Sequence, residues 1–410
     1  MEKLLSEVLE RVTPTGEEKL GDGRMVELTL EKLRSYGVEP MLVGSMAKNT
    51  DLRGDKDIDV FILFPPEVGW DKLEKKGLEV GKRFFKDVGG EYEIDYAEHP
   101  YVKGRYEGFD IEIVPCFKGG GIQSSVDRTP LHLEYVKKKL DEKPGYADDI
   151  RLLKQFMKGV KVYGAEAKVE GFSGYLTEIL VINYGNFIEV LDKARKWSGV
   201  EVIDVEGHWP ERESLKHFFT EANLIVVDPV DKNRNVAAAL SLECLGRFKS
   251  AAQEFIMHHS IDFFFPPDKP LRSAGELEGV IESRGTLLKA ILFHHSKINE
   301  NTLYAQLRRS LRALREECER KEFKVFKTGF WSNEKDVSVL LLEFSVHELP
   351  EIVHHQGPPL TADVRHIERF KDKHQDQEPY VKDDRWVVDT ARRYTDANVL
   401  LDELVKARRG

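Results

Sequence analysis

The first third of the chain carries apolar residues first with a helical period and then with the spacing of strands. Apolar side chains recur every three or four positions in residues 1–12 and 24–36, which predicts helices there. Short apolar runs at Pro40–Val43 and Ile58–Phe64 predict strands. The pattern then predicts a helix, two strands and a helix, at 71–87, Tyr92–Ala97, Gly108–Pro115 and 127–140. Together these elements predict an α/β unit of roughly 140 residues, a common domain size.

The middle of the chain has mainly helical patterns. Residues 141–145 contain Pro and Gly and read as a linker. Beyond the linker we predict helices and short strands, the helices at 146–160, 172–197 and 233–258 and the strands at Val202–Val205 and Leu224–Val227.

The last third begins at a proline-rich break, Phe263–Pro270. Its strand–helix–strand–strand order predicts a split βαβ layer, from Thr286–His294, Leu303–Lys321, Phe323–Thr328 and Val337–His347. The polar tail at 361–410 has two predicted helices. We therefore expect three domains, at 1–142, 143–262 and 263–410.

Composition and charge narrow the class of protein. The 410 residues are 41% hydrophobic and 33% charged, which is enough apolar material for several cores. The net charge of -10 argues only weakly against a nucleic-acid partner, because phosphate binding depends on local clusters of Lys and Arg. Three widely spaced cysteines favour neither a disulfide framework nor a zinc site. With an acidic N-terminus and no long apolar run, we expect a soluble, cytoplasmic protein without a membrane segment.

The segment Leu42–Phe64 holds the clearest chemical signal. Gly44-Ser45 follows a predicted strand and opens a helix, and small residues at a helix N-terminus favour an anion such as phosphate. Asp57 and Asp59 stand two apart on a strand and therefore share one face. Adjacent carboxylates need a cation between them, and Mg²⁺ bound with substrate phosphates meets that need. A solvated Asp-rich turn is the alternative interpretation. The two aspartates by themselves would favour that turn over a metal site.

A further acidic site lies on another predicted strand, Phe109–Pro115. Asp110 and Glu112 share one face of this strand, and isoleucines share the other. A third carboxylate beside the aspartate pair would complete a two-metal site, in which one metal activates an attacking hydroxyl and the other steadies a leaving pyrophosphate. Strand parity does not choose between Asp110 and Glu112.

A Gly-Ser turn, a pair of aspartates on a strand and a separate third carboxylate resemble the DNA polymerase β-like nucleotidyltransferase superfamily. Longer segments resemble the archaeal-type CCA-adding enzymes within it, namely AEHPYV (97–102), VPCF (114–117), SSVDRTPLH (124–132), RLLKQFMK (151–158), VYGAE (162–166), GFSGYLTE (171–178) and VVDPVDKNRNVAAALS (226–241). The resemblance implies an α+β fold with a polymerase β-like nucleotidyltransferase head, a mainly helical central domain, and a C-terminal α/β, split βαβ-like body with a helical tail. It also implies template-independent addition of CCA to the 3′ end of tRNA from CTP and ATP.

The resemblance assigns metal binding to Asp57, Asp59 and Glu112. The family often has Glu-x-Asp and then Asp, so in this chain the longer side chain has moved to the third position. With Mg²⁺ held there, the tRNA 3′ hydroxyl would attack the α-phosphate of CTP or ATP in line.

Contacts to the incoming nucleotide are implied at Gly44, Ser45, Lys48, His132, Lys154, Tyr163 and Arg234. Lys48 stands where the family often has Arg, and would hold the triphosphate, with Ser45, as a point charge. Three of these residues also have plainer interpretations. His132 could be a capping or surface histidine, Lys154 a lysine on a solvated helix face, and Tyr163 a core tyrosine with its hydroxyl at the surface.

Arg234 is implied to lie near the base of the incoming nucleotide. Its guanidinium donors match the acceptor atoms of C or A, whereas G and U present a different pattern. We expect Arg234 to open the helix predicted at 233–258. A salt bridge to Asp228 or Asp231 is the plainer interpretation, and both can hold at once.

The implied RNA partner is the acceptor and T-arm minihelix of tRNA, recognised by shape and backbone. Arg308, Arg312 and Arg315 recur at helical spacing within the basic stretch 307–327, and Lys406–Arg409 is a second candidate. Glutamates in the same stretch leave an ordinary solvated helix equally open. Family members are often dimers, so a homodimer is possible on this resemblance.

Two other functions remain open. A poly(A) polymerase-like RNA 3′ nucleotidyltransferase would use the same carboxylates, but VDRTPLH and DPVDKNRNVAAALS favour CCA addition. A non-catalytic RNA-binding protein with a degenerate transferase domain is the second alternative. The intact carboxylates argue against it, because an inactive site has no reason to keep like charges together.

Overall fold

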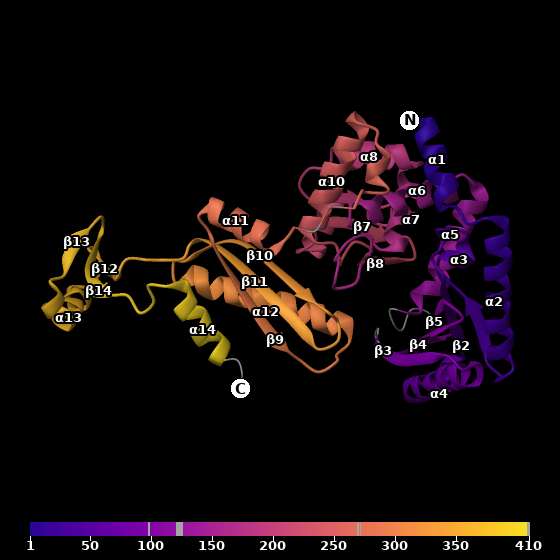
Figure 1. The fold of residues 1–410 in the computed structure, drawn as a ribbon, viewed down its shortest axis with the longest axis horizontal. Coiled ribbons are helices and arrows are strands. Elements are labelled where there is room, and N and C mark those ends of the chain that lie inside the picture. Colours follow the sequence, from indigo (N-terminus) through magenta and orange to yellow (C-terminus); the bar gives the residue numbers. More distant parts are fainter. Residues whose placement is uncertain (97–98, 120–125, 269, 271, 408–410) are drawn as a thin grey trace. The chain divides into compact units, whose positions relative to one another are not determined.

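A mixed β-sheet forms the N-terminal part of the chain (Figure 1). The computed structural model describes residues 1–96, 99–119, 126–268, 270 and 272–407, which fall into two compact units, Met1–Asp268 and Lys269–Gly410. In the first unit the strand order is β1-β2-β5-β4-β3, with β2 and β5 parallel and the other neighbours antiparallel. The strands are β1 Glu39–Leu42, β2 Asp57–Phe64, β3 Glu91–Tyr96, β4 Pro100–Tyr106 and β5 Phe109–Phe117.

Apolar alternation in β2 decides which face of this sheet is buried. Ile58, Val60 and Ile62 are fully buried in a cluster with residues of the helices on that face. The aspartates of β2 point to the other face, as the spacing predicted. Helical elements of this part are α2 Gly16–Arg34, α3 Gly44–Lys48, η1 Pro66–Val68 and α4 Trp70–Val88.

The strand β4 was not predicted from the sequence. Polar residues and Gly104 interrupt its apolar pattern, although Val102 is fully buried. Gly104 is required there, because a Cβ would lie 2.2 Å from the Glu91 carbonyl oxygen and 2.6 Å from the Phe85 ring.

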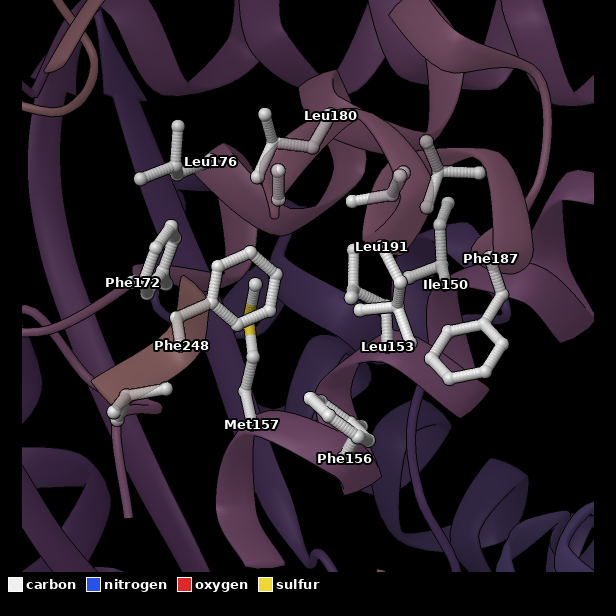
Figure 2. Packing of buried hydrophobic residues seen from close by; sticks show 14 of the residues in the cluster. Ile150, Leu153, Phe156, Met157, Phe172, Leu176, Leu180, Phe187, Leu191 and Phe248 are labelled. Atoms are coloured by element: carbon white, nitrogen blue, oxygen red, sulfur yellow. The ribbon is translucent and has the colours of Figure 1, made fainter. Parts of the chain in front are cut away.

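The remainder of the first unit is a mainly helical core rich in aromatic residues. Figure 2 shows Phe156, Phe172, Phe187 and Phe248 among its buried leucines and isoleucines. Phe264 packs 5.7 Å from the Phe156 ring, so this core continues past the expected boundary at 262/263. Its elements are α1 Glu2–Val12, α5 Arg128–Glu142, α6 Tyr146–Gly159, α7 Gly174–Tyr184, α8 Phe187–Ala194, β6 Glu201–Ile203, α9 Arg212–Phe218, β7 Leu224–Asp228, β8 Asp231–Asn235, α10 Leu242–Met257 and η2 Ile261–Phe263.

The helices predicted at 172–197 and 233–258 are wrong in extent. The first is broken at Gly185, whose φ of +97° ends α7, and the Asn186 side chain accepts from the Glu189 amide to start α8. The second begins only at Leu242, where the Ser241 side chain caps α10. The chain before α10 is a hairpin in which β7 and β8 pair antiparallel.

The second unit contains the predicted split βαβ layer. Its sheet has the order β10-β11-β9, and β11 is antiparallel to both neighbours, so β9 and β10 run parallel. The helix α12 packs against this sheet, and its leucines are buried. The elements are α11 Ala274–Arg284, β9 Leu287–His294, α12 Glu300–Arg320, β10 Lys324–Ser332 and β11 Val337–Val346.

The tail contains the expected helices, α13 Val364–Lys373 and α14 Ala397–Ala407, and also a sheet that was not predicted. The sheet has the order β12-β14-β13, with β12 Ile352–Pro359, β13 Tyr380–Lys382 and β14 Arg385–Ala391, and η3 lies at Gln375–Gln377. Lys406–Arg409 was the second basic segment proposed to contact RNA, and its two arginines lie outside the described residues. Residues 97–98 and 124–125, which belong to segments that carry the family resemblance, also lie outside them. The predicted α+β fold class is confirmed.

Candidate active site

The turn after β1 brings the backbone close to a carboxylate. α3 begins at Gly44 directly after the strand, as predicted. Gly44 has a φ of +71°, and a Cβ there would lie 1.9 Å from Asp59 Oδ2. The Val43 amide donates to the Asp59 carbonyl over 2.9 Å, which fixes β2 beside the turn. Only glycine fits between this turn and the aspartate.

The parallel pairing of β2 with β5 gathers the acidic residues. Asp57 is opposite Asp110, and Asp59 is opposite Glu112. Arg105 binds Asp110 through hydrogen bonds of 2.9 and 3.2 Å, so this carboxylate already has a cationic partner. The acidic residues line a cavity of about 340 Å³, together with Gly44, Ser45, Lys48, Lys154, Tyr163, Gly174, Tyr175 and Glu178.

Burial and mutual repulsion act on these carboxylates. Burial, and after it the Asp57 charge, raises the pKa of Asp59 to about 6. Burial, followed by the Asp59 charge, raises the pKa of Glu112 to about 7. A divalent cation would offset this repulsion, and carboxylate oxygens are the ligands that hard cations prefer. In the described part of the chain, no group of three or more acidic, His or Cys side chains has the arrangement that holding a metal ion requires.

The lysines predicted to meet a nucleotide lie in the wall of the same cavity. Lys48 Nζ pairs with Glu178 Oε2 at 2.6 Å, and Glu178 is almost fully buried. Lys154 Nζ donates to the Thr50 carbonyl over 2.9 Å. Lys154 is 3% exposed, so the interpretation as a solvated helix face is wrong. Burial lowers the pKa of Lys154 to about 8, although the Glu178 charge acts in the opposite direction.

Tyr163 joins this wall from the segment that follows α6. It pairs with Phe172 in an isolated bridge and packs against the helical core, which confirms the core position that the plainer interpretation expected but not a hydroxyl at the surface. It also lines the carboxylate cavity. Burial raises the pKa of its hydroxyl.

His132 and Arg234 meet at a buried aspartate. His132 Nε2 and Arg234 Nη1 each lie 2.8 Å from Asp228 Oδ2, which confirms the predicted Arg234–Asp228 salt bridge. The expectation that Arg234 opens a helix is wrong, because it lies in the strand β8. The His132 side chain is 12% exposed, so it is not a surface histidine. The Tyr175 hydroxyl also donates to Asp228, over 3.1 Å.

Sequence reasoning missed Tyr175 and Glu178 as parts of this region, and it named Asp228 only as a salt-bridge partner of Arg234. Tyr175 and Glu178 lie in GFSGYLTE, and Asp228 lies in VVDPVD, both segments that carry the family resemblance. A glutamate within the apolar helix α7 was the available signal, since a buried charge needs a partner.

Known families match most of the chain. The nucleotidyltransferase domain matches residues 25–156, the second domain of tRNA nucleotidyltransferase matches 148–265, and the C-terminal domain of the CCA-adding enzyme matches 284–410. The CCA-adding enzyme of Archaeoglobus fulgidus is 40% identical over 96% of this chain and 87% of its own length. The chain belongs to the CCA-adding enzyme family. The CCA-adding enzyme of Methanothermobacter thermautotrophicus is 38% identical over 98% of this chain and 87% of its own length.

Family membership confirms the predicted resemblance and the enzyme class, a tRNA nucleotidyltransferase. It also implies use of a divalent metal ion. Among solved structures, a cytoplasmic RNA terminal U-transferase matches with a TM-score of 0.51 at 14% identity, over 66% of this chain and 98% of that one. The RNA terminal uridylyl transferase Cid1 matches with a TM-score of 0.53 at 13% identity, over 66% and 98%. At such identities these matches show a shared fold.

Of the helices in the described residues, none combines the length and the apolar character that crossing a membrane requires.

Proposed function

We propose that this CCA-adding family member adds C, C and A in turn to the 3′ end of tRNA, using CTP and ATP and no nucleic-acid template. The observation that carries the proposal is the cavity that brings the Gly44 turn together with Asp57, Asp59 and Glu112. The 40% identity to a CCA-adding enzyme over 96% of the chain supports the same substrates.

In the proposed reaction the 3′ hydroxyl oxygen of tRNA attacks the α-phosphorus of the nucleotide. The bond between the α-phosphorus and the oxygen that bridges to the β-phosphate breaks, pyrophosphate leaves with the electron pair, and the proton of the attacking hydroxyl passes to solvent. Asp57, Asp59 and Glu112 would hold Mg²⁺, which when bound favours ionisation of the hydroxyl and neutralises charge on the phosphates. Glu112 fits this role better than Asp110 because Arg105 already binds Asp110.

The triphosphate would lie against Ser45, Lys48 and Lys154, with Tyr163 beside it in the same cavity. Lys48 is paired with Glu178 in the structure, so a triphosphate would compete with that carboxylate for the ammonium group. His132 would contact the nucleotide, and Arg234, which is 36% exposed, would meet the base.

We further propose a division of roles along the chain. Residues 1–142 would carry the catalysis, 143–262 would bind the nucleotide and tRNA, and 263–410 would bind the tRNA minihelix. The exposed Arg309 and Arg312 of α12 support RNA contact there, while Arg315 pairs with Glu319 at 2.8 Å. The free, buried cysteines are consistent with a reducing cytoplasm. A homodimer is proposed on family resemblance alone.

The experiment that tests this function is incorporation of each labelled nucleoside triphosphate into tRNA that lacks its CCA end, with Mg²⁺ and with EDTA. Addition of C, C and A that stops there and needs metal is the expected result. Long A-tails would make the protein a poly(A) polymerase. Binding of tRNA without any incorporation would make it a non-catalytic RNA-binding protein.

A further inference from the structure

A buried carboxylate joins the proposed nucleotide contacts from the helical core. Asp228, at the end of β7, has 0% exposure. Its Oδ2 accepts hydrogen bonds from His132 Nε2 and Arg234 Nη1, each at 2.8 Å. Its Oδ1 accepts from the Tyr175 hydroxyl and from the Val230 amide, each at 3.1 Å. One side chain thus links α5, α7 and β8.

Packing and charge hold this arrangement in place. The Tyr175 ring stacks on the His132 ring with centroids 3.8 Å apart and planes at 23°, so His132 is held by a ring face as well as by Asp228. Burial alone would raise the pKa of Asp228, but the hydrogen bond from His132 and those from the Val230 amide and Arg234 hold it at about 2. The carboxylate is therefore an anion that accepts all of these donors.

We propose that Asp228 is a positioning residue that couples Arg234 to His132, so that a mismatched base slows the chemical step as well as weakening binding. This inference rests on the nucleotide contacts proposed above for those two residues. Their hydrogen bonds end on the same oxygen atom, so a shift of the guanidinium changes the acceptor that orients the imidazole. Arg234 is the more exposed of the two and can meet a base, whereas His132 lies deeper.

Tyr175 connects this cluster to the carboxylate cavity. Its side chain lines the cavity with Asp59 and Glu112 while its hydroxyl binds Asp228. Contacts therefore run without a break from Arg234 through Asp228 and Tyr175 to the carboxylate cavity.

A double-mutant cycle tests the coupling in the full-length protein. Single-turnover incorporation of CTP and of UTP into tRNA that ends before the first C would be measured for His132→Gln, Arg234→Gln and the double variant. We expect non-additive effects on the CTP-to-UTP ratio of kcat/KM, with a coupling factor of about tenfold, as for residues that share a partner. Effects that simply multiply would overturn the coupling.

A second variant addresses Asp228 directly. Asp228→Asn keeps the shape but replaces one acceptor oxygen with a donor, and we expect kcat for CTP to fall more than KM rises, with tRNA affinity unchanged. Asp231→Asn is the matched control, because it removes the carboxylate charge from the 2.8 Å Arg128–Asp231 pair of the same hairpin and does not alter the side chain of Asp228. Equal kinetics of the two variants would overturn the proposal.

The outcomes separate this inference from the proposed function. If Asp228→Asn fails to fold, the cycle still decides, since it retains Asp228. Single variants with unchanged turnover and selectivity would remove the proposed contacts of His132 and Arg234, and the coupling with them. Single variants that each change turnover or selectivity, with effects that multiply in the double variant, would overturn the coupling and leave the two nucleotide contacts in place.

Discussion

Replacing Gly44 with alanine tests how closely the turn after β1 is fitted to the carboxylate of Asp59. The new Cβ would lie 1.9 Å from Asp59 Oδ2 and 2.9 Å from its Cγ. Relief of that overlap requires a movement of at least about 1 Å, because non-bonded atoms settle beyond about 3 Å. The φ of +71° adds backbone strain on the order of 1 kcal/mol for alanine. A displacement of about 1 Å at a reacting group can cost on the order of 100-fold in rate, so kcat for CTP incorporation should fall by that factor.

Gly37→Ala is the matched control for this substitution. Gly37 has a φ of +78°, and among the described residues nothing lies within 4 Å of its added Cβ. The control should show the backbone strain alone, as a lower midpoint of thermal unfolding with CTP incorporation near wild type. Both variants would be compared by thermal unfolding and by single-turnover CTP incorporation. Equal activity of the two would refute the argument that Gly44 is required by its contact with Asp59.

The remaining predictions concern metal binding, base selection and pH. Asp59→Ala should abolish incorporation of both CTP and ATP while tRNA binding in a filter assay survives; turnover near wild type would remove Asp59 from the mechanism. Arg234→Ala should reduce selectivity against UTP and GTP more than it reduces total activity, and unchanged selectivity would mean that the base is read elsewhere. The folded-state pKa of Lys154 is lowered to about 8 from 10.5, so between those pH values the unfolded chain binds more protons and this residue makes the free energy of unfolding rise with pH. Urea unfolding at several pH values should show that the free energy of unfolding of Lys154→Met rises less with pH than that of the wild type. The same slope in both proteins would contradict the lowered pKa of Lys154.

The parts of the site that depend on neighbouring residues were predictable from the sequence. Asp57 and Asp59 stand two apart on a strand whose alternate residues are apolar, and this fixes their common face. Gly44 follows a short strand and opens a helix, and the structure adds the reason that it must be glycine. Strand parity left Asp110 and Glu112 open, and the family resemblance named Glu112. The structure adds the contact of Arg105 with Asp110, which no local pattern specifies.

Contacts between distant segments could not be predicted in this way. The pair formed by Lys48 and Glu178 spans 130 positions, and no local pattern specifies it. The segment around Arg234 precedes an alanine-rich stretch that favours a helix, but it forms a strand. The Asn235 side chain explains the difference, because it accepts from the Val226 amide and donates to the Leu224 carbonyl, each at 2.9 Å, which holds the hairpin.

The sheet of the tail was missed because it lacks a clear apolar alternation. β13 has no buried residue, and β12 carries adjacent histidines, His354 and His355, where alternation would be expected. Strands that bury little surface leave little trace in a hydrophobic pattern.

The most direct test of the central claim is the sequence of the new 3′ ends. Purified protein would be incubated with tRNA that lacks CCA, an equal mixture of the four nucleoside triphosphates and Mg²⁺, and the products would be sequenced. The account predicts ends of C, CC and CCA alone for the wild type, and no extension for Asp57→Ala. Ends of other sequence, or equal extension by Asp57→Ala, would contradict it.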